Sequence, residues 1–159
     1  MKFTTAVLAA AMMAVSSSAS AQLPTSRILT IDVAQIIAQE AMAGCRADGS
    51  KIAVLVVDSL NAPKVLLRDD GVGAWAGEVA KMKATAAMLY NRPSGPAKPL
   101  PPGTAAPPAT IPGTVNAPGG VPIKVGEATI GAVAVSGAGN EKDLACANMG
   151  IAKAASKLK

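Results

Sequence analysis

The chain has 159 residues and a formal net charge of +5, and its composition is 50% hydrophobic although only 2% aromatic. It contains no histidine, which excludes a Ser-His-Asp triad, a Cys-His pair, an HExxH zinc helix and a histidine-ligated metal within this chain. The basic residues are scattered singly along the sequence, so a nucleic-acid partner has little support.

Residues 1–21 have the layout of a secretory signal peptide. The second residue is a lysine, an apolar run extends from Ala6 to Val15, and small residues at Ala19 and Ala21 precede the expected cleavage site. The run covers about ten residues, whereas a membrane-spanning helix needs roughly twenty. A buried N-terminal helix is the alternative. We therefore expect a periplasmic or secreted protein whose mature chain, residues 22–159, forms a single domain without a membrane span.

The mature chain begins with an amphipathic helix followed by a hairpin. Thr30 is the expected N-cap, and Gly49 is a suitable stop. Between them, apolar residues recur at the spacing that buries one face of a helix. They are Ala34, Ile37, Ala38, Ala41, Met42 and Cys45. The continuous apolar run from Ile52 to Val57 predicts a strand covered on both faces, and residues 64–68 predict its hairpin partner.

A second helix is expected over residues 75–90, where apolar residues again recur at helical spacing. The predicted buried stripe consists of Val79, Met82, Ala86 and Leu89. Two basic residues, Lys81 and Lys83, interrupt this stripe and are expected to flank it.

Prolines then dominate the sequence, because ten of the twelve lie between Arg92 and Ile123. Each proline fixes φ and removes a backbone amide, so neither a helix nor a sheet interior tolerates this density. We expect a long surface loop at about residues 92–118, with a polyproline II stretch at Pro99 to Pro102.

Regular structure resumes after this loop. Residues 121–125 and 128–136 predict a second hairpin, and Asn140 is the expected cap of a last helix. The predicted buried stripe of that helix consists of Leu144, Ala147, Ile151, Ala154 and Leu158. Hairpins separated by helices favour an α+β domain in which helices pack on a mainly antiparallel sheet.

The core of such a domain would be thin, because Ala, Val, Ile and Leu each bury little surface. We therefore expect added stability from a disulfide, from oligomerisation or from both. Cys45 and Cys146 are the only cysteines, and their separation excludes a CxxC redox motif. Export favours a disulfide between them over two buried free thiols, and closing so long a loop would contribute about 4 kcal/mol in the chain-entropy model.

Arg68-Asp69-Asp70-Gly71 is the sequence feature most suggestive of a binding site. A strand end followed by charges and a glycine can line a pocket, although an ordinary polar hairpin end has the same pattern. Lys81 and Lys83 on the next helix would add positive charge to the same mouth. Gly119 and Gly120 would let the backbone approach a ligand closely, or they simply serve a sharp turn.

Taken in order, several segments resemble the GlcG/HbpS-like family, which is also described as haem-binding or haem-degrading. The matching segments are Val54 to Asp58, Arg68 to Gly71, Lys83 to Ala86, Gly119 to Ile123, and Gly131 to Ala138 with Asp143 beyond. Their order and spacing agree over nearly the whole mature chain.

The resemblance implies a profilin-like fold, with an antiparallel sheet of about five strands packed with helices, and assembly into a homo-oligomer. It also implies a small-molecule ligand, for which haem or a related tetrapyrrole is the cofactor suggested by the family. The ligand-binding residues that it points to are Arg68, Asp70, Lys83, Thr85, Tyr90, Gly119, Gly120 and Ser136.

The absence of histidine limits how haem would be held, because an axial ligand must come from another side chain. The nearest donors on the second predicted helix are Tyr90, Met82, Met88 and Thr85, although the methionines are equally suited to core packing. Arg68 and Lys83 would pair with haem propionates, or equally with a small carboxylate such as a hydroxy acid.

The sequence thus predicts a periplasmic small-ligand-binding protein. The alternative is a small-carboxylate-binding accessory protein of an oxidation pathway. An enzyme has less support, because no acid–base pair and no activated nucleophile stand out, with Asp58 and Asp70 as isolated carboxylates.

Overall fold

A computed structural model describes residues 25–96 and 111–159 of the chain. The predicted signal peptide and the predicted polyproline II stretch lie outside the described residues. The helices and strands are, in chain order, α1 (Ile31–Ala47), β1 (Ala53–Asp58), β2 (Pro63–Arg68), α2 (Trp75–Tyr90), β3 (Gly120–Val125), β4 (Ala128–Ser136), α3 (Asn140–Ala154) and a terminal 3-10 turn (Ala155–Lys157). None of these helices is long and apolar enough to cross a membrane.

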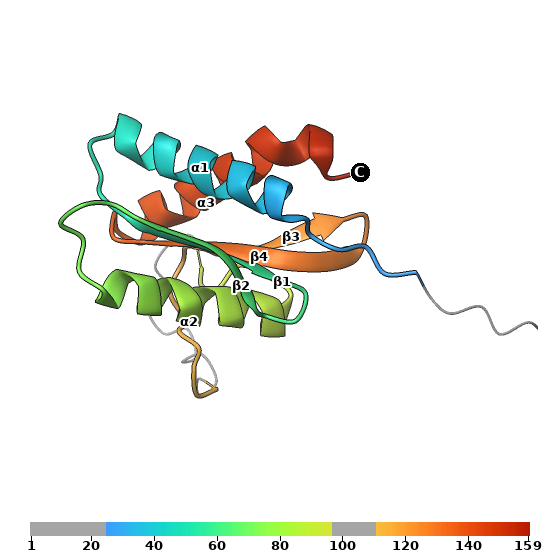
Figure 1. Cartoon of the computed structure of the whole chain (residues 1–159). Helices are drawn as coiled ribbons and strands as arrows, with labels where there is room; N and C mark the ends of the chain where they lie inside the picture. Colours follow the sequence, from blue (N-terminus) through green and yellow to red (C-terminus); the bar gives the residue numbers. More distant parts are fainter. Residues whose placement is uncertain (1–24, 97–110) are drawn as a thin grey trace, which may run out of the picture.

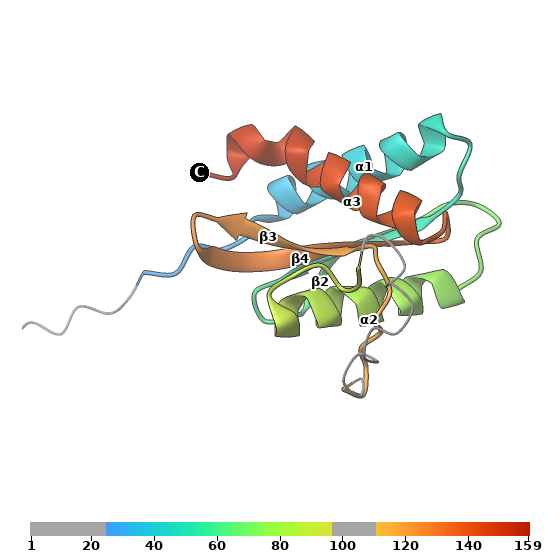
Figure 2. The same cartoon turned by 180° about the vertical axis from the view of Figure 1, so that it is seen from behind.

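The elements form three layers, with one sheet between helices. Helices α1 and α3 lie side by side on one face of the sheet and α2 covers the other (Figures 1 and 2). The strand order is β2-β1-β4-β3, and all three neighbouring pairs are antiparallel. The α+β class and the two hairpins are therefore confirmed. The described residues form four strands rather than the expected five, because each hairpin supplies only two.

The sheet face beneath α1 and α3 carries the larger apolar side chains. Val54 and Val56 of β1, with Val133 and Val135 of β4, are fully buried there. The predicted buried stripe of α1 is confirmed at every position, and Thr30 caps this helix by accepting a hydrogen bond from the Val33 amide. The helical spacing of apolar residues predicts the buried face of α1 correctly because this helix turns its whole apolar stripe toward the sheet.

The opposite face is built mainly from alanine. Ala132 and Ala134 of β4 meet small residues of α2, with Leu55 and Val57 of β1 beside them. The buried residues of α2 are Ala76, Ala80, Lys83, Ala84, Ala86 and Ala87. The predicted stripe is wrong except at Ala86, since Val79 and Met82 are half-buried and Leu89 is exposed. Alanine on both surfaces lets the helix approach the sheet closely, so burial here follows small size rather than hydrophobicity.

The last helix also differs in detail from the prediction. Gly139 occupies the N-cap position, and Asn140 is the first helical residue rather than the cap. Ala147 and Ala154 are buried as predicted, whereas Leu144, Ile151 and Leu158 are only partly buried against the core.

Cys45 of α1 and Cys146 of α3 form the expected disulfide, with Cα atoms 5.6 Å apart. Both residues are buried in the core that the two helices share. The bond joins the first and last helices across 101 residues of sequence. It therefore closes a loop that contains α2 and all four strands.

Asp69 ties the end of α1 to the sheet. Its Oδ2 accepts a hydrogen bond of 2.8 Å from the Ile52 amide, and its Oδ1 accepts one of 2.7 Å from Arg46 Nε. Burial alone would raise the pKa of the Asp69 carboxyl. The Ile52 amide, the Arg46 guanidinium and the charge of Lys51 outweigh burial and hold that pKa below its ordinary value.

This lowered pKa predicts a pH-dependent contribution of Asp69 to stability. A carboxyl whose pKa is lower in the folded than in the unfolded state stabilises the fold above the unfolded pKa, about 4, and stops doing so as the pH falls through the folded pKa. Asp69→Asn should lower the free energy of unfolding by about 1.5–3 kcal/mol at pH 7 and by progressively less below pH of about 4. Urea unfolding across this range measures the difference, with the exposed Asp70→Asn as control. A deficit of constant size at every pH would contradict the prediction.

Candidate functional site

A hollow of about 340 Å³ lies between the edge strand β2 and the first half of α2; we call it the β2–α2 hollow. Its apolar lining comes from Leu55, Pro63, Leu66, Ala74 and Gly77. Its charged lining comes from Arg68, Glu78 and Lys81. Two cations and one carboxylate leave a net positive charge beside an apolar wall.

Arg68 is held in place at the mouth of this hollow. It ends β2, and its Nη1 donates a hydrogen bond to the carbonyl oxygen of Val72 in the loop that leads to α2. A guanidinium has five N–H donors in a rigid fork, so this contact leaves others for an anion. Lys81 is exposed on α2 and contributes a second cation from a different element.

Leu66 supplies the most unusual part of the lining. Leu66 is 56% exposed although it belongs to strand β2. Its two methyl groups lie 3.8 and 3.9 Å from the position that a Cβ on Gly77 would occupy. Glycine at position 77 leaves the helix surface open here. An exposed apolar wall with cations at its rim is suited to a ligand that combines an apolar body with an acidic group.

A second hollow, also of about 340 Å³, lies where β4 ends and α3 begins. Lys83, Ser136, Asp143 and Trp75 are among the residues that line it. The expected meeting of Lys83 with Arg68 therefore does not occur, because the two side chains line different hollows on opposite sides of α2. Lys81, two residues earlier on the helix, is the lysine that shares a hollow with Arg68.

Lys83 is buried and donates two hydrogen bonds to groups of this chain. Its Nζ lies 2.7 Å from Asp143 Oδ2 and 3.0 Å from the Val135 carbonyl oxygen, and both charged side chains are 3% exposed. The other oxygen of Asp143 accepts a hydrogen bond from the Ala138 amide. Lys83 thus lies on the buried face of α2, whereas the sequence predicts that it flanks this face. Its burial is tolerated because Asp143 supplies the carboxylate partner that a buried ammonium needs.

The two glycines after the proline-rich segment pack against this ion pair. Gly119 has φ of +126°, and a Cβ built there would meet the Val135 carbonyl oxygen at 2.6 Å and Lys83 Nζ at 2.8 Å. A Cβ on Gly120 would collide with the Lys83 carbonyl oxygen. Their freedom lets the chain pass over its own ion pair, and this close approach explains both glycines without a ligand.

The remaining predicted site residues are dispersed. Thr85 lies on α2 and its hydroxyl accepts a hydrogen bond from Asn61 Nδ2 in the β1–β2 turn. Tyr90 ends α2, and the Arg92 guanidinium lies 5.4 Å from its ring centre. Asp70 is exposed, and its carbonyl oxygen accepts a hydrogen bond from Lys51. None of these three residues lines the β2–α2 hollow.

Sequence reasoning missed the role of Asp143 as the partner of Lys83. Asp143 stands out in the sequence only as part of the family resemblance, without a role of its own. A lysine within an otherwise apolar helical face was the one signal that a buried carboxylate had to exist elsewhere. In the part of the chain that the structure describes, no group of three or more Cys, Asp or Glu side chains is placed to hold a metal ion.

The buried pair predicts a strongly non-additive mutational cycle. Lys83→Met leaves Asp143 buried without its cation and should lower the free energy of unfolding by about 3–5 kcal/mol. Asp143→Asn should cost a similar amount, whereas the double variant should lose clearly less than the sum of the two. Urea unfolding measures all three, with Lys81→Met on the exposed side of the same helix expected to change stability by no more than about 0.5 kcal/mol. Additive losses would show that the pair is not energetically coupled.

Comparison with known proteins identifies relatives of the whole domain. The family model described as haem degrading protein HbpS-like matches residues 29–152. A crystal structure of HbpS is 33% identical, has a TM-score of 0.73, and is matched over 86% of this chain and 96% of that chain. A double mutant of Streptomyces reticuli HbpS is 27% identical, with a TM-score of 0.70 over 91% of this chain and 97% of that chain.

A less similar solved structure shares the fold. A crystal structure of a PduOC–haem complex is 19% identical, with a TM-score of 0.69 over 80% of this chain and 95% of that chain. No curated protein sequence matches the chain. The family match covers all three helices except the last residues of α3, and all four strands. The chain therefore belongs to the HbpS-like family.

Proposed function

We propose that the protein is a small-ligand-binding protein that holds a tetrapyrrole, haem or a related ring, at the β2–α2 hollow. The observation that carries this proposal is the pairing of two cations from different elements, Arg68 and Lys81, with an exposed apolar wall that includes Leu66. A tetrapyrrole with propionates has the matching chemistry, since its ring is apolar and its acidic groups lie along one edge.

The relatives support a tetrapyrrole among the ligands with this chemistry. The family is described as haem degrading, and the PduOC structure of the same fold contains haem. The volume of the hollow lies near the lower end of the range for small-molecule sites, about 300–1,000 Å³. It therefore suits one edge of the ring, with the rest of the ligand lying along β2 and α2.

The residues present fit the carboxylates of haem better than its iron. Of the expected axial donors, Tyr90, Met82, Met88 and Thr85, none lines the hollow. The two cysteines are joined in the disulfide, so neither offers a thiolate. Iron would supply redox chemistry when haem is bound, but this chain would hold the ring chiefly by its propionates and its apolar edge.

This mode of binding predicts that the iron is dispensable. Haemin and iron-free protoporphyrin should bind with similar affinity, and Arg68→Ala should weaken both by about tenfold or more, because it removes a charge-assisted hydrogen bond. Titration followed by absorbance for haemin and by fluorescence for protoporphyrin measures the two affinities. Lys153→Ala, which removes an exposed cation from α3, is the matched control. Unchanged affinity of Arg68→Ala for both rings would disprove the site.

The limited volume of the hollow favours a second candidate, a small carboxylate such as a hydroxy acid. Such a ligand would occupy the space between Arg68 and Lys81 without extending beyond it. Calorimetry with glycolate distinguishes the two candidates. Glycolate heat that is lost in Arg68→Ala, together with no porphyrin binding, would favour the small acid.

We also propose that the protein is exported, as residues 1–21 predict. The buried Cys45–Cys146 disulfide supports this, because such bonds persist in oxidising compartments. The protein recovered from its native compartment should begin at Gln22 and contain no thiol that reacts with an alkylating agent after denaturation. An intact Met1 in the mature protein, or two reactive thiols, would count against export. The homo-oligomeric state stays a prediction.

A further inference from the structure

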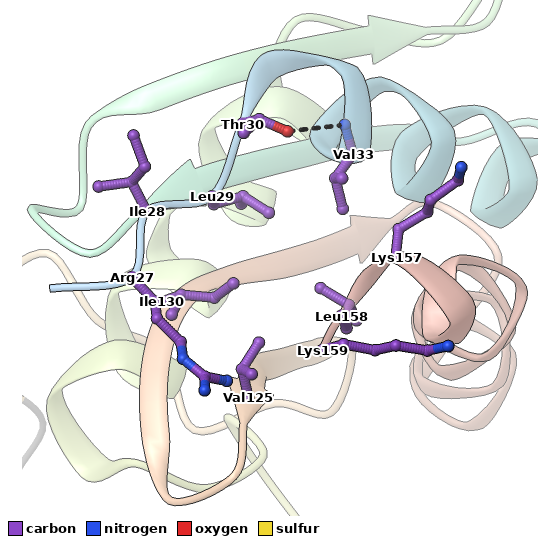
Figure 3. A pocket seen from close by; sticks show the side chains of 10 residues that line it. All are labelled: Arg27, Ile28, Leu29, Thr30, Val33, Val125, Ile130, Lys157, Leu158 and Lys159. Carbon is purple, nitrogen blue, oxygen red and sulfur yellow. Dashed lines mark hydrogen bonds between the residues drawn. The ribbon is translucent and has the colours of Figure 1, made fainter.

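A third hollow, of about 290 Å³, lies away from both sides of α2. It is formed where residues 27–30 enter α1, where the β3–β4 hairpin turns, and where the chain leaves α3 (Figure 3). We call it the terminal hollow, after the two ends of the domain that form it. Neither the haem proposal nor the small-carboxylate proposal uses any of its residues.

The floor of the terminal hollow is apolar and well ordered by packing. Leu29, Val125 and Ile130 belong to the buried core, with Val33 and Leu158 half-buried beside them. Figure 3 shows these five side chains gathered between the entry to α1 and the β3–β4 hairpin. The floor thus draws on three segments of the chain, the entry to α1, the β3–β4 hairpin and the C-terminal end, which makes it a shared apolar surface rather than a single exposed side chain.

The rim carries three cationic side chains and no acidic side chain. Arg27, Lys157 and Lys159 are exposed residues of the lining, which contains no aspartate or glutamate. Asp32 and Glu127 are the acidic residues nearest to the lining in sequence, and within residues 25–96 and 111–159 neither forms an ion pair with these cations. Three like charges around one apolar floor repel one another, and an anion placed among them relieves that repulsion.

The terminal hollow has cationic side chains at its rim and apolar side chains at its floor, an arrangement that favours an amphipathic anion. In Figure 3, Arg27 extends from one side of the floor, while Lys157 and Lys159 extend from the other. The start of α1, with Thr30 at the N-cap, adds the positive end of a 17-residue helix at the same rim. An occupant therefore meets positive charge at the rim and hydrocarbon at the floor.

We propose that the terminal hollow binds an anion with a single alkyl chain, of the medium-chain carboxylate class. The chain lies on the floor formed by Leu29, Ile130 and Leu158, and the carboxylate lies among the rim cations. The floor is a hollow lined by several segments of the chain, which suits a free ligand better than the face of a bilayer.

Octanoate and 1-octanol test the proposal, because they share a chain length and differ in charge. Calorimetric titration of the mature protein should show saturable binding of octanoate and at least tenfold weaker binding of octanol. Arg27→Ala combined with Lys157→Ala should weaken octanoate binding at least tenfold. Lys153→Ala, which removes an exposed lysine of α3 outside the hollow, should leave it unchanged.

Two further measurements show where octanoate binds and whether the double variant is folded. Octanoate should shift the backbone amide resonances of Thr30 and Val33, and unfolding curves should show that the double variant is as folded as the parent. Equal affinity for octanol and octanoate would overturn the proposal. It would also fail if the protein bound phosphatidylglycerol vesicles but not octanoate, because this face would then be a membrane-binding surface.

Discussion

The buried ion pair between Lys83 and Asp143 is the contact on which the arrangement of the layers depends. It joins α2, on one face of the sheet, to the first turn of α3, which covers the other, at the edge where β4 ends. Removing either partner would leave an isolated charge in the interior, which is far more costly than losing an ordinary contact. The backbone around it is adapted accordingly, since Gly119 passes so close that no side chain would fit.

The unlike faces of the sheet explain where the hollows form. Under α1 and α3 the strands present valine and isoleucine, and a disulfide joins the two helices above them. Under α2 they present Ala132 and Ala134, so the helix lies close and its larger apolar residues turn outward. This outward turn leaves Trp75 61% exposed and opens a hollow on each side of the helix. Close packing of small residues thus creates the surface on which the proposed ligand site lies.

The three hollows differ in the positive charge that they offer to a ligand. At the end of β4 the lysine is neutralised internally, so that hollow offers no free cation from Lys83. At β2 the cations Arg68 and Lys81 remain open to an external anion. At the terminal hollow the lining contains three cationic side chains and no aspartate or glutamate. Two sites with different linings are therefore proposed for different anions.

The local spacing of apolar residues along the chain is enough to predict the α+β class, the hairpins, the helix boundaries to within a few residues, and the buried face of α1. The small number of cysteines also favours the pairing of Cys45 with Cys146. The three-dimensional arrangement was needed to show that Lys83 points inward to Asp143 while Lys81 shares a hollow with Arg68, and that α2 buries alanine rather than valine and leucine. Those outcomes depend on which residues from distant segments meet across the sheet. A local sequence pattern does not specify these long-range contacts.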